Sequence, residues 1–202
     1  ISSIVRIGDR CVFRPRFTEL LGDKVSCKSL DNRTGCAVLI RIAQMINEAK
    51  KECPFHIVLL FSSREETGEQ GATAAAYHIA ASEALIFDVS YGYTPDAPRH
   101  RCGEMGKGPM IGYSPVLSRT MSDRLIHLAK EKEIPYQLEV MSPSTGTNAD
   151  AIMIAGTGTP AGMLSVPLRY MHTPAEVISL SDIEYTAKLA FEYLMSGGMN
   201  YD

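Results

Sequence analysis

Short apolar runs alternate with helix-like periodicities along this chain, and this alternation constrains the fold more than any other feature. Residues 55–61, 84–89 and 161–166 are largely apolar at successive positions, so both faces of such strands would be buried. Strands of this kind need helices on each side of their sheet. The sequence therefore predicts an α/β fold: a three-layer α/β/α sandwich around a central mixed, mainly parallel sheet.

The other elements follow from periodicity and from Pro, Gly and Ser signals. After Asp31, apolar side chains recur at helical spacing up to Ala49, and Pro54 ends this predicted helix. Ser181 is the expected N-cap of the last helix. Residues 90–109, rich in Gly, Pro, Tyr and Arg, favour a long loop over one end of the sheet. The sequence further predicts strands at 3–6, 10–13 and 136–141, and helices at 71–81, 115–132, 149–155 and 181–195.

The composition excludes several classes of function. The chain has 202 residues, 45% of them apolar, which suits one globular domain with a substantial core. A net charge of −3 without a long run of Lys and Arg argues against a nucleic-acid partner. No apolar segment approaches the length of a membrane span, so no membrane partner is expected. Scattered cysteines without a C-x-x-C pair favour a reducing, cytoplasmic location: Cys11, Cys27, Cys36, Cys53 and Cys102.

Two adjacent acids, Glu65 and Glu66, directly follow the first of the three apolar runs. Acids at the end of a buried strand repel each other and lose hydration, so such a pair indicates a bound cation or a catalytic base. Asp31, Asp88 and His172 also stand at or near the ends of predicted elements, where α/β domains place their chemistry. Carboxylates and an imidazole suit zinc, cobalt or manganese, so the set predicts a two-metal hydrolase.

Each of these residues also has a plain structural interpretation. Asp31 can cap or turn the chain before a helix. Glu65 and Glu66 can open a solvated helix, whose dipole favours negative charge there. His172 can be a hydrogen-bonded structural histidine. The residues alone leave these alternatives open.

Longer motifs narrow the choice. Each is weak alone, but their order and spacing together are specific, and they run through nearly all of the chain. They are Gly-Asp-Arg at 8–10, Leu-Asp-Asn-Arg-Thr-Gly at 30–35, Arg-Glu-Glu-Thr-Gly at 64–68, Phe-Asp-Val at 87–89, Ile-Pro-Tyr-Gln at 134–137, Thr-Gly-Thr-Asn-Ala at 145–149 and Val-Pro-Leu-Arg-Tyr-Met-His at 166–172. With them the chain resembles the glutamyl aminopeptidase/TET family of dinuclear metallo-aminopeptidases, some members of which are labelled endoglucanases.

The resemblance implies a role for each candidate residue. Asp31 would bridge two divalent metal ions, zinc or cobalt, and the Asp31–Asn32 bond would be cis. Glu66 and His172 would hold one ion with Asp31, while Asp88 would serve the other. Glu65 would be the general base that activates a water between the ions. The implied reaction releases N-terminal residues from peptide substrates.

One departure from the family pattern limits this expectation. The family has an upstream His-x-Asp motif, whose His completes the site of Asp88, and a small inserted β domain; neither is present in residues 1–202. We therefore expect residues 1–202 to be the C-terminal portion of a catalytic domain without its N-terminal segment and the β dimerisation domain. The metal site of Asp88 would lack one ligand.

Two other functions stay open. The chain can be a truncated, catalytically incomplete metal-binding or structural remnant of the family. A weaker alternative is an exopeptidase or deacylase of a neighbouring dinuclear zinc family. By the resemblance, the full-length protein would form homo-oligomers, from dimers up to dodecamers.

Overall fold

A four-stranded sheet lies at the centre of the molecule, in a computed structural model that describes residues 4–50 and 52–199. Its strand order is β3-β6-β4-β5. The pairs β3–β6 and β4–β5 are parallel, whereas β4 and β6 are antiparallel. The prediction of a mixed, mainly parallel sheet is confirmed. The strands are β3 (Ala84–Tyr91), β4 (Met110–Tyr113), β5 (Gln137–Val140) and β6 (Ala161–Leu168).

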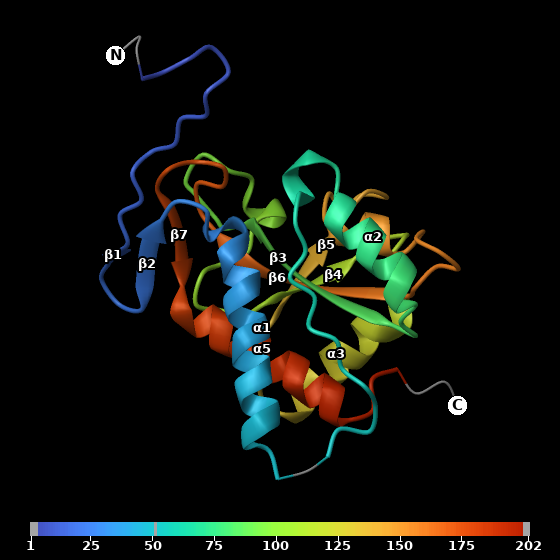
Figure 1. Ribbon diagram of the computed structural model, residues 1–202. Helices are drawn as coiled ribbons and strands as arrows, with labels where there is room; N and C mark the ends of the chain where they lie inside the picture. The colour runs from blue at the N-terminus through green and yellow to red at the C-terminus, as the bar shows by residue number, and fades with distance from the viewer. Residues whose placement is uncertain (1–3, 51, 200–202) are drawn as a thin grey trace.

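Helices cover both faces of this sheet, as the doubly apolar strands predicted (Figure 1). Every residue of β6 is buried. Leu164 and Val166 face a core shared with α1 (Leu30–Glu48), α3 (Arg119–Glu131) and α5 (Leu180–Met195). The alternate residues, Ala161 and Met163, pack toward α2 (Gln70–Ile79) and α4 (Asn148–Ile152). The three-layer α/β/α sandwich is therefore confirmed.

A small antiparallel sheet, β1-β2-β7, stands beside the main one. It joins β1 (Thr18–Glu19) and β2 (Lys24–Cys27) to β7 (Glu176–Ser179), and the sequence had predicted none of the three. The predicted strands at 3–6 and 10–13 are wrong: residues 4–6 and 10–13 form no strand, and Ser3 lies outside the described residues. Their apolar side chains find no core, since Val12 and Phe13 are 78% and 71% exposed.

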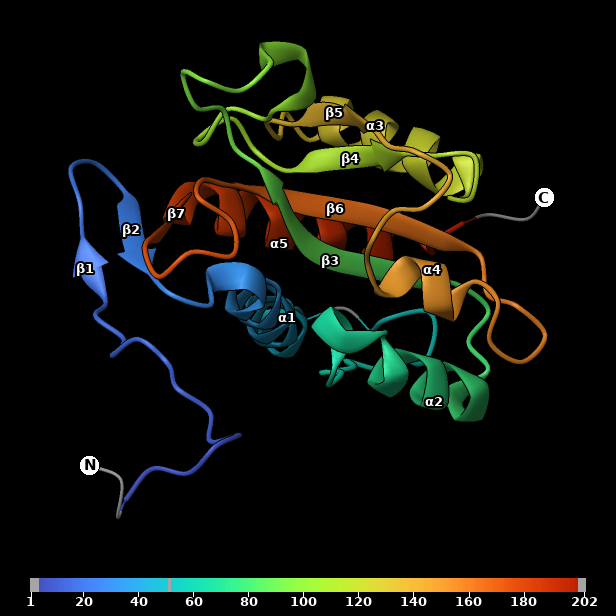
Figure 2. The same cartoon turned by 90° about the horizontal axis from the view of Figure 1, so that it is seen from above.

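The prediction of a buried strand at 55–61 is also wrong. These residues are irregular and make no sheet pairing, and they run between α1 and α2 (Figure 1, Figure 2). Val58 is 59% exposed and Phe61 is 51% exposed. The run has the apolarity of a buried strand, but the described part of the chain supplies no strand that pairs with it. In the main sheet, β3 pairs with β6 on one side, and no strand among the described residues pairs with its other side.

Helix starts differ from the predictions by a few residues. Ser118 caps α3, so this helix begins at Arg119 and not near 115. The N-cap of α5 is Ser179, and Ser181 belongs to the first turn. Asp23 explains this shift, because its Oδ2 accepts hydrogen bonds from the Ser179 hydroxyl and the Ser181 N–H. Hydrogen bonds from these two serines lower the pKa of Asp23 to about 2. A residue distant in sequence thus caps the helix.

Among residues 4–50 and 52–199, none of the helices has the length and apolarity that crossing a membrane requires.

Candidate active site

Asp31 stands at an irregular start of α1. Asp31 and Asn32 have non-helical backbone angles, and the Asp31–Asn32 bond is cis, as the resemblance implied. The Asn32 side chain caps the regular helix, since its Oδ1 accepts from the Gly35 N–H at 2.7 Å. Its Nδ2 donates to the Phe87 carbonyl at 2.9 Å, which ties this turn to β3.

Gly35 is required where α1 approaches β3. A Cβ at this position would lie 2.6 Å from Asn32 Oδ1 and 2.9 Å from the Phe87 carbonyl oxygen. The second atom belongs to the backbone of a buried strand and cannot withdraw like a flexible side chain. The Leu-Asp-Asn-Arg-Thr-Gly motif therefore combines a candidate ligand, a cap and a close approach in six residues.

Glu65 and Glu66 open the short 3₁₀ helix η1 (Glu65–Thr67). Arg64, just before it, has a left-handed backbone with φ of 60°. This turn leaves Glu65 half-buried and Glu66 exposed. The two neighbouring acids thus occupy different environments, which suits different chemical roles.

His172 lies in the connection between β6 and β7 and faces the start of α1. Its Nε2 is 3.0 Å from Asp31 Oδ2 and 3.6 Å from Glu66 Oε2. One ligand atom from each of these three side chains lies within 4.8 Å of the others. Three residues that are far apart in sequence therefore form one cluster, which we call the acid–imidazole cluster: Asp31, Glu66 and His172.

Asp88 stands outside the acid–imidazole cluster. It is buried on β3, 6% exposed, and its Oδ1 accepts from the Val89 N–H at 2.9 Å. Burial raises the pKa of Asp88 to about 8, and the charges of Glu65 and Asp31 add to the rise. Its carboxyl is therefore electrostatically coupled to the cluster, although it is not one of the three grouped ligand atoms.

Asp31 and Glu65 are also costly to ionise. Burial raises the pKa of Asp31 to about 6, helped by the neighbouring Glu66 carboxylate and opposed by His172. Burial raises the pKa of Glu65 to about 7, and the charges of Glu66 and Asp31 contribute. A divalent cation would offset this repulsion, and carboxylate oxygens with an imidazole nitrogen are suitable donors for zinc, cobalt or manganese. The residues present fit such an ion.

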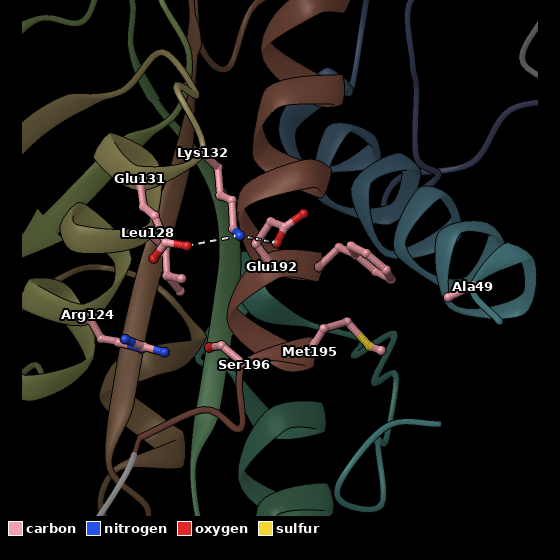
Figure 3. A pocket seen from close by; sticks show the side chains of 9 residues that line it. Ala49, Arg124, Leu128, Glu131, Lys132, Glu192, Met195 and Ser196 are labelled. Atoms are coloured by element: carbon pink, nitrogen blue, oxygen red, sulfur yellow. Dashed lines mark ion pairs between the residues drawn. The ribbon is translucent and has the colours of Figure 1, made fainter. Parts of the chain in front are cut away.

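The pocket in Figure 3 lies away from this site. Ala49, at the C-terminal end of α1, and Met195, at the end of α5, line it, whereas Asp31 is at the opposite end of α1. Lys132 Nζ in this pocket pairs with Glu131 at 3.0 Å and lies 3.8 Å from Glu192 (Figure 3). None of the described residues that line it is a histidine. The pocket is therefore not part of the acid–imidazole cluster.

Known proteins of similar sequence are aminopeptidases by description. A family model described as M42 glutamyl aminopeptidase matches residues 1–189. A putative aminopeptidase of Acetivibrio thermocellus is 36% identical over 194 residues, covering 94% of this chain and 56% of that protein. A lysyl aminopeptidase of Pyrococcus furiosus is 31% identical over 185 residues, covering 92% of this chain and 52% of that protein.

Solved structures agree in fold. An aminopeptidase from the archaeon Desulfurococcus kamchatkensis matches with a TM-score of 0.87 and 30% identity, covering 96% of this chain and 55% of that one. The Pyrococcus horikoshii TET1 peptidase, which can assemble into a tetrahedron or a large octahedral shell, matches with a TM-score of 0.77 and 27% identity, covering 96% and 56%.

The chain spans about half the length of the curated relatives it matches. The prediction that residues 1–202 form a catalytic domain without an inserted β domain stays a prediction. The family model covers nearly the whole chain, and it agrees with the ordered motifs and with the fold of the solved structures. This chain therefore belongs to the M42 glutamyl aminopeptidase family.

Proposed function

We propose that this chain carries the main catalytic residues of a metal-dependent aminopeptidase that releases N-terminal residues from peptides. The observation that supports it best is the acid–imidazole cluster, which gathers Asp31, Glu66 and His172 within 4.8 Å in a chain of this family. Zinc or cobalt ions bound there would polarise the peptide carbonyl, lower the pKa of a water and hold the free amine of the substrate.

The residues divide the work as follows in this proposal. Asp31, Glu66 and His172 would hold one ion, and Asp88 together with Asp31 would serve a second. Glu65 accepts the proton of the attacking water and returns it to the leaving amine. Its half-buried carboxyl suits this task, since burial raises the pKa of Glu65 to about 7, near the working pH.

A substrate panel tests the reaction. The protein expressed from its whole reading frame is assayed with aminoacyl nitroanilides and with the same compounds acetylated on the amine. An aminopeptidase hydrolyses the free-amine compounds and leaves the acetylated ones intact, because the site must hold the amine. Hydrolysis of the acetylated compounds at an equal rate would instead identify a deacylase or another amidase.

A second candidate is a metal-binding or structural remnant without activity. The position of Asp88 favours it, because this carboxyl is not among the three grouped ligand atoms. Metal analysis of the purified protein separates the two functions. About two equivalents of metal per chain are expected of the aminopeptidase, and one or none of the remnant.

Metal binding should depend strongly on pH. Without metal, burial raises the pKa of Asp31, Glu65 and Asp88 to about 6, 7 and 8, so these acids are partly protonated near neutrality. A cation that binds carboxylates must displace such protons, so its affinity rises from pH 6 to 8 and levels off only well above pH 8. Calorimetry at pH 6.5 in two buffers of different ionisation enthalpy should show release of roughly one to two protons. A pH-independent affinity across this range would contradict the proposed site.

We also propose that the full-length protein forms a homo-oligomer. The Pyrococcus horikoshii relative can assemble into a tetrahedron or a large octahedral shell. Large apolar side chains are exposed near the start of this chain, with Ile7 fully exposed and Leu21 95% exposed. Such side chains commonly mark contacts with another chain or segment.

A further inference from the structure

Glu176 is a buried carboxylate behind the acid–imidazole cluster. It is the first residue of β7 and is 2% exposed. Its Oε2 accepts hydrogen bonds from the Leu30 N–H at 2.6 Å and the Asp31 N–H at 3.1 Å. Its Oε1 accepts from the His172 N–H at 2.9 Å. One side chain therefore holds the backbone of two segments that each supply a candidate ligand.

The two segments need such support. Ser29, two residues before Asp31, has φ of 57°, and His172 itself has φ of 62°. Residues other than glycine adopt this left-handed conformation at a cost and keep it where the surroundings enforce it. The Leu30 and Asp31 N–H groups also belong to the start of a helix, where the backbone offers them no acceptor. Glu176 provides that acceptor.

Glu176 does more than cap a helix, because its two carboxylate oxygens bind different segments. Oε2 holds the Asp31 segment and Oε1 holds the His172 segment, so the rigid carboxylate sets the distance between them. The outcome is the 3.0 Å separation of His172 Nε2 from Asp31 Oδ2. A metal ion that binds ligands already placed in this way need not order them.

We propose that Glu176 is a positioning residue for the metal site, which fixes Asp31 and His172 relative to each other before the ion binds. This inference rests on the metal site of the proposed function, but not on peptide hydrolysis. A purely structural role would require only that the three N–H groups be satisfied. A positioning role requires in addition that metal affinity depend on Glu176 beyond any loss of stability.

The test compares Glu176→Gln with a matched control, Asp182→Asn. Asp182 is also fully buried, and it accepts two backbone hydrogen bonds, from Gly106 and Gly108 at 2.7 and 2.8 Å, away from the cluster. In each variant the side-chain amide keeps one oxygen that can accept a hydrogen bond. Its NH₂ group replaces the other oxygen and cannot accept from a backbone N–H, so each variant loses the contacts of one of its two oxygens. The unfolding temperatures of the two metal-free variants then show what the loss of one link costs in each.

Cobalt affinity is the deciding measurement, by calorimetry and by the visible absorption of the bound ion, on the protein expressed from its whole reading frame. Glu176→Gln should weaken binding by about 10–100-fold and change the cobalt spectrum, whereas Asp182→Asn should leave both unchanged. Unchanged affinity in Glu176→Gln would overturn the inference, and so would an equal loss in Asp182→Asn. If Glu176→Gln does not fold, the shorter Glu176→Asp, which keeps the charge but cannot span both segments, takes its place.

The outcomes separate this inference from the proposed function. A wild-type protein that binds cobalt but hydrolyses no peptide refutes the aminopeptidase and leaves the comparison of affinities valid. A wild-type protein that binds no cobalt overturns both. Full activity with unchanged affinity in Glu176→Gln overturns only the positioning role.

Discussion

Replacing Glu65 by glutamine should lower kcat by a factor of about 10²–10⁴ while metal affinity changes little. Glutamine keeps the size of the side chain but cannot accept a proton from the attacking water. Glu65 is also not a member of the acid–imidazole cluster, so the ion should remain bound in this variant. The measurement is kcat on an aminoacyl substrate, together with the metal content of the same preparation.

Glu69→Gln is the matched control for this variant. Glu69 follows η1 closely, is half-buried like Glu65, and burial likewise raises its pKa. Its charge acts on Glu65, so its loss tests whether a change of local field is sufficient to lower the rate. Glu69→Gln should leave kcat nearly unchanged. Wild-type kcat in Glu65→Gln would remove Glu65 from the role of base.

Replacing Asp31 by asparagine should weaken metal binding by at least about 100-fold, more than the loss of a supporting residue causes. The same variant should be no less stable than the wild type without metal. Burial raises the pKa of Asp31 to about 6, so its stabilising contribution is complete below its ordinary value of 3.8 and is lost as pH rises through 6. At pH 7.5 the neutral amide should therefore stabilise the metal-free protein.

Weaker metal binding together with a more stable metal-free protein distinguishes a metal ligand from an acid with a structural role. Asp150→Asn supplies the comparison, because Asp150 accepts hydrogen bonds from Thr145 and Gly146 in a turn outside the cluster. This variant should unfold at a lower temperature and bind metal as the wild type does. Thermal unfolding of the metal-free proteins and calorimetric titration with zinc give both quantities. If Asp31→Asn lowers stability and keeps its affinity, Asp31 is not a ligand.

Local patterns in the sequence were sufficient to predict the sandwich and the neighbourhood of the site. The run that forms β6 is apolar at successive positions, so both faces of the strand must be buried, and this predicted helices on both sides of the sheet. Acids and a histidine at or near element ends predicted that Asp31, Glu66 and His172 would meet, because α/β domains place their chemistry there.

Features set by distant partners could not be read from the sequence. The four residues of β2 pair with the two residues of β1 on one side and, on the other, with β7, about 150 residues later. The carboxylate of Glu176 accepts from Leu30 and Asp31 across a similar distance, and no local pattern marks it. The apolar run 55–61 was mispredicted for a different reason. Its composition indicates a buried strand, but no strand among the described residues pairs with it and buries it.

The candidate base and ligand, Glu65 and Glu66, follow a segment that no sheet supports. Residues 55–61 lead into them without sheet pairing, and the nearby strand β3 has a partner along one side only. The sheet therefore does not restrict the backbone of this segment. Ordering both glutamates around an ion would then cost conformational entropy at the time of binding. A strand that pairs with residues 55–61 would reduce that entropy loss and so act on the reaction without touching the substrate.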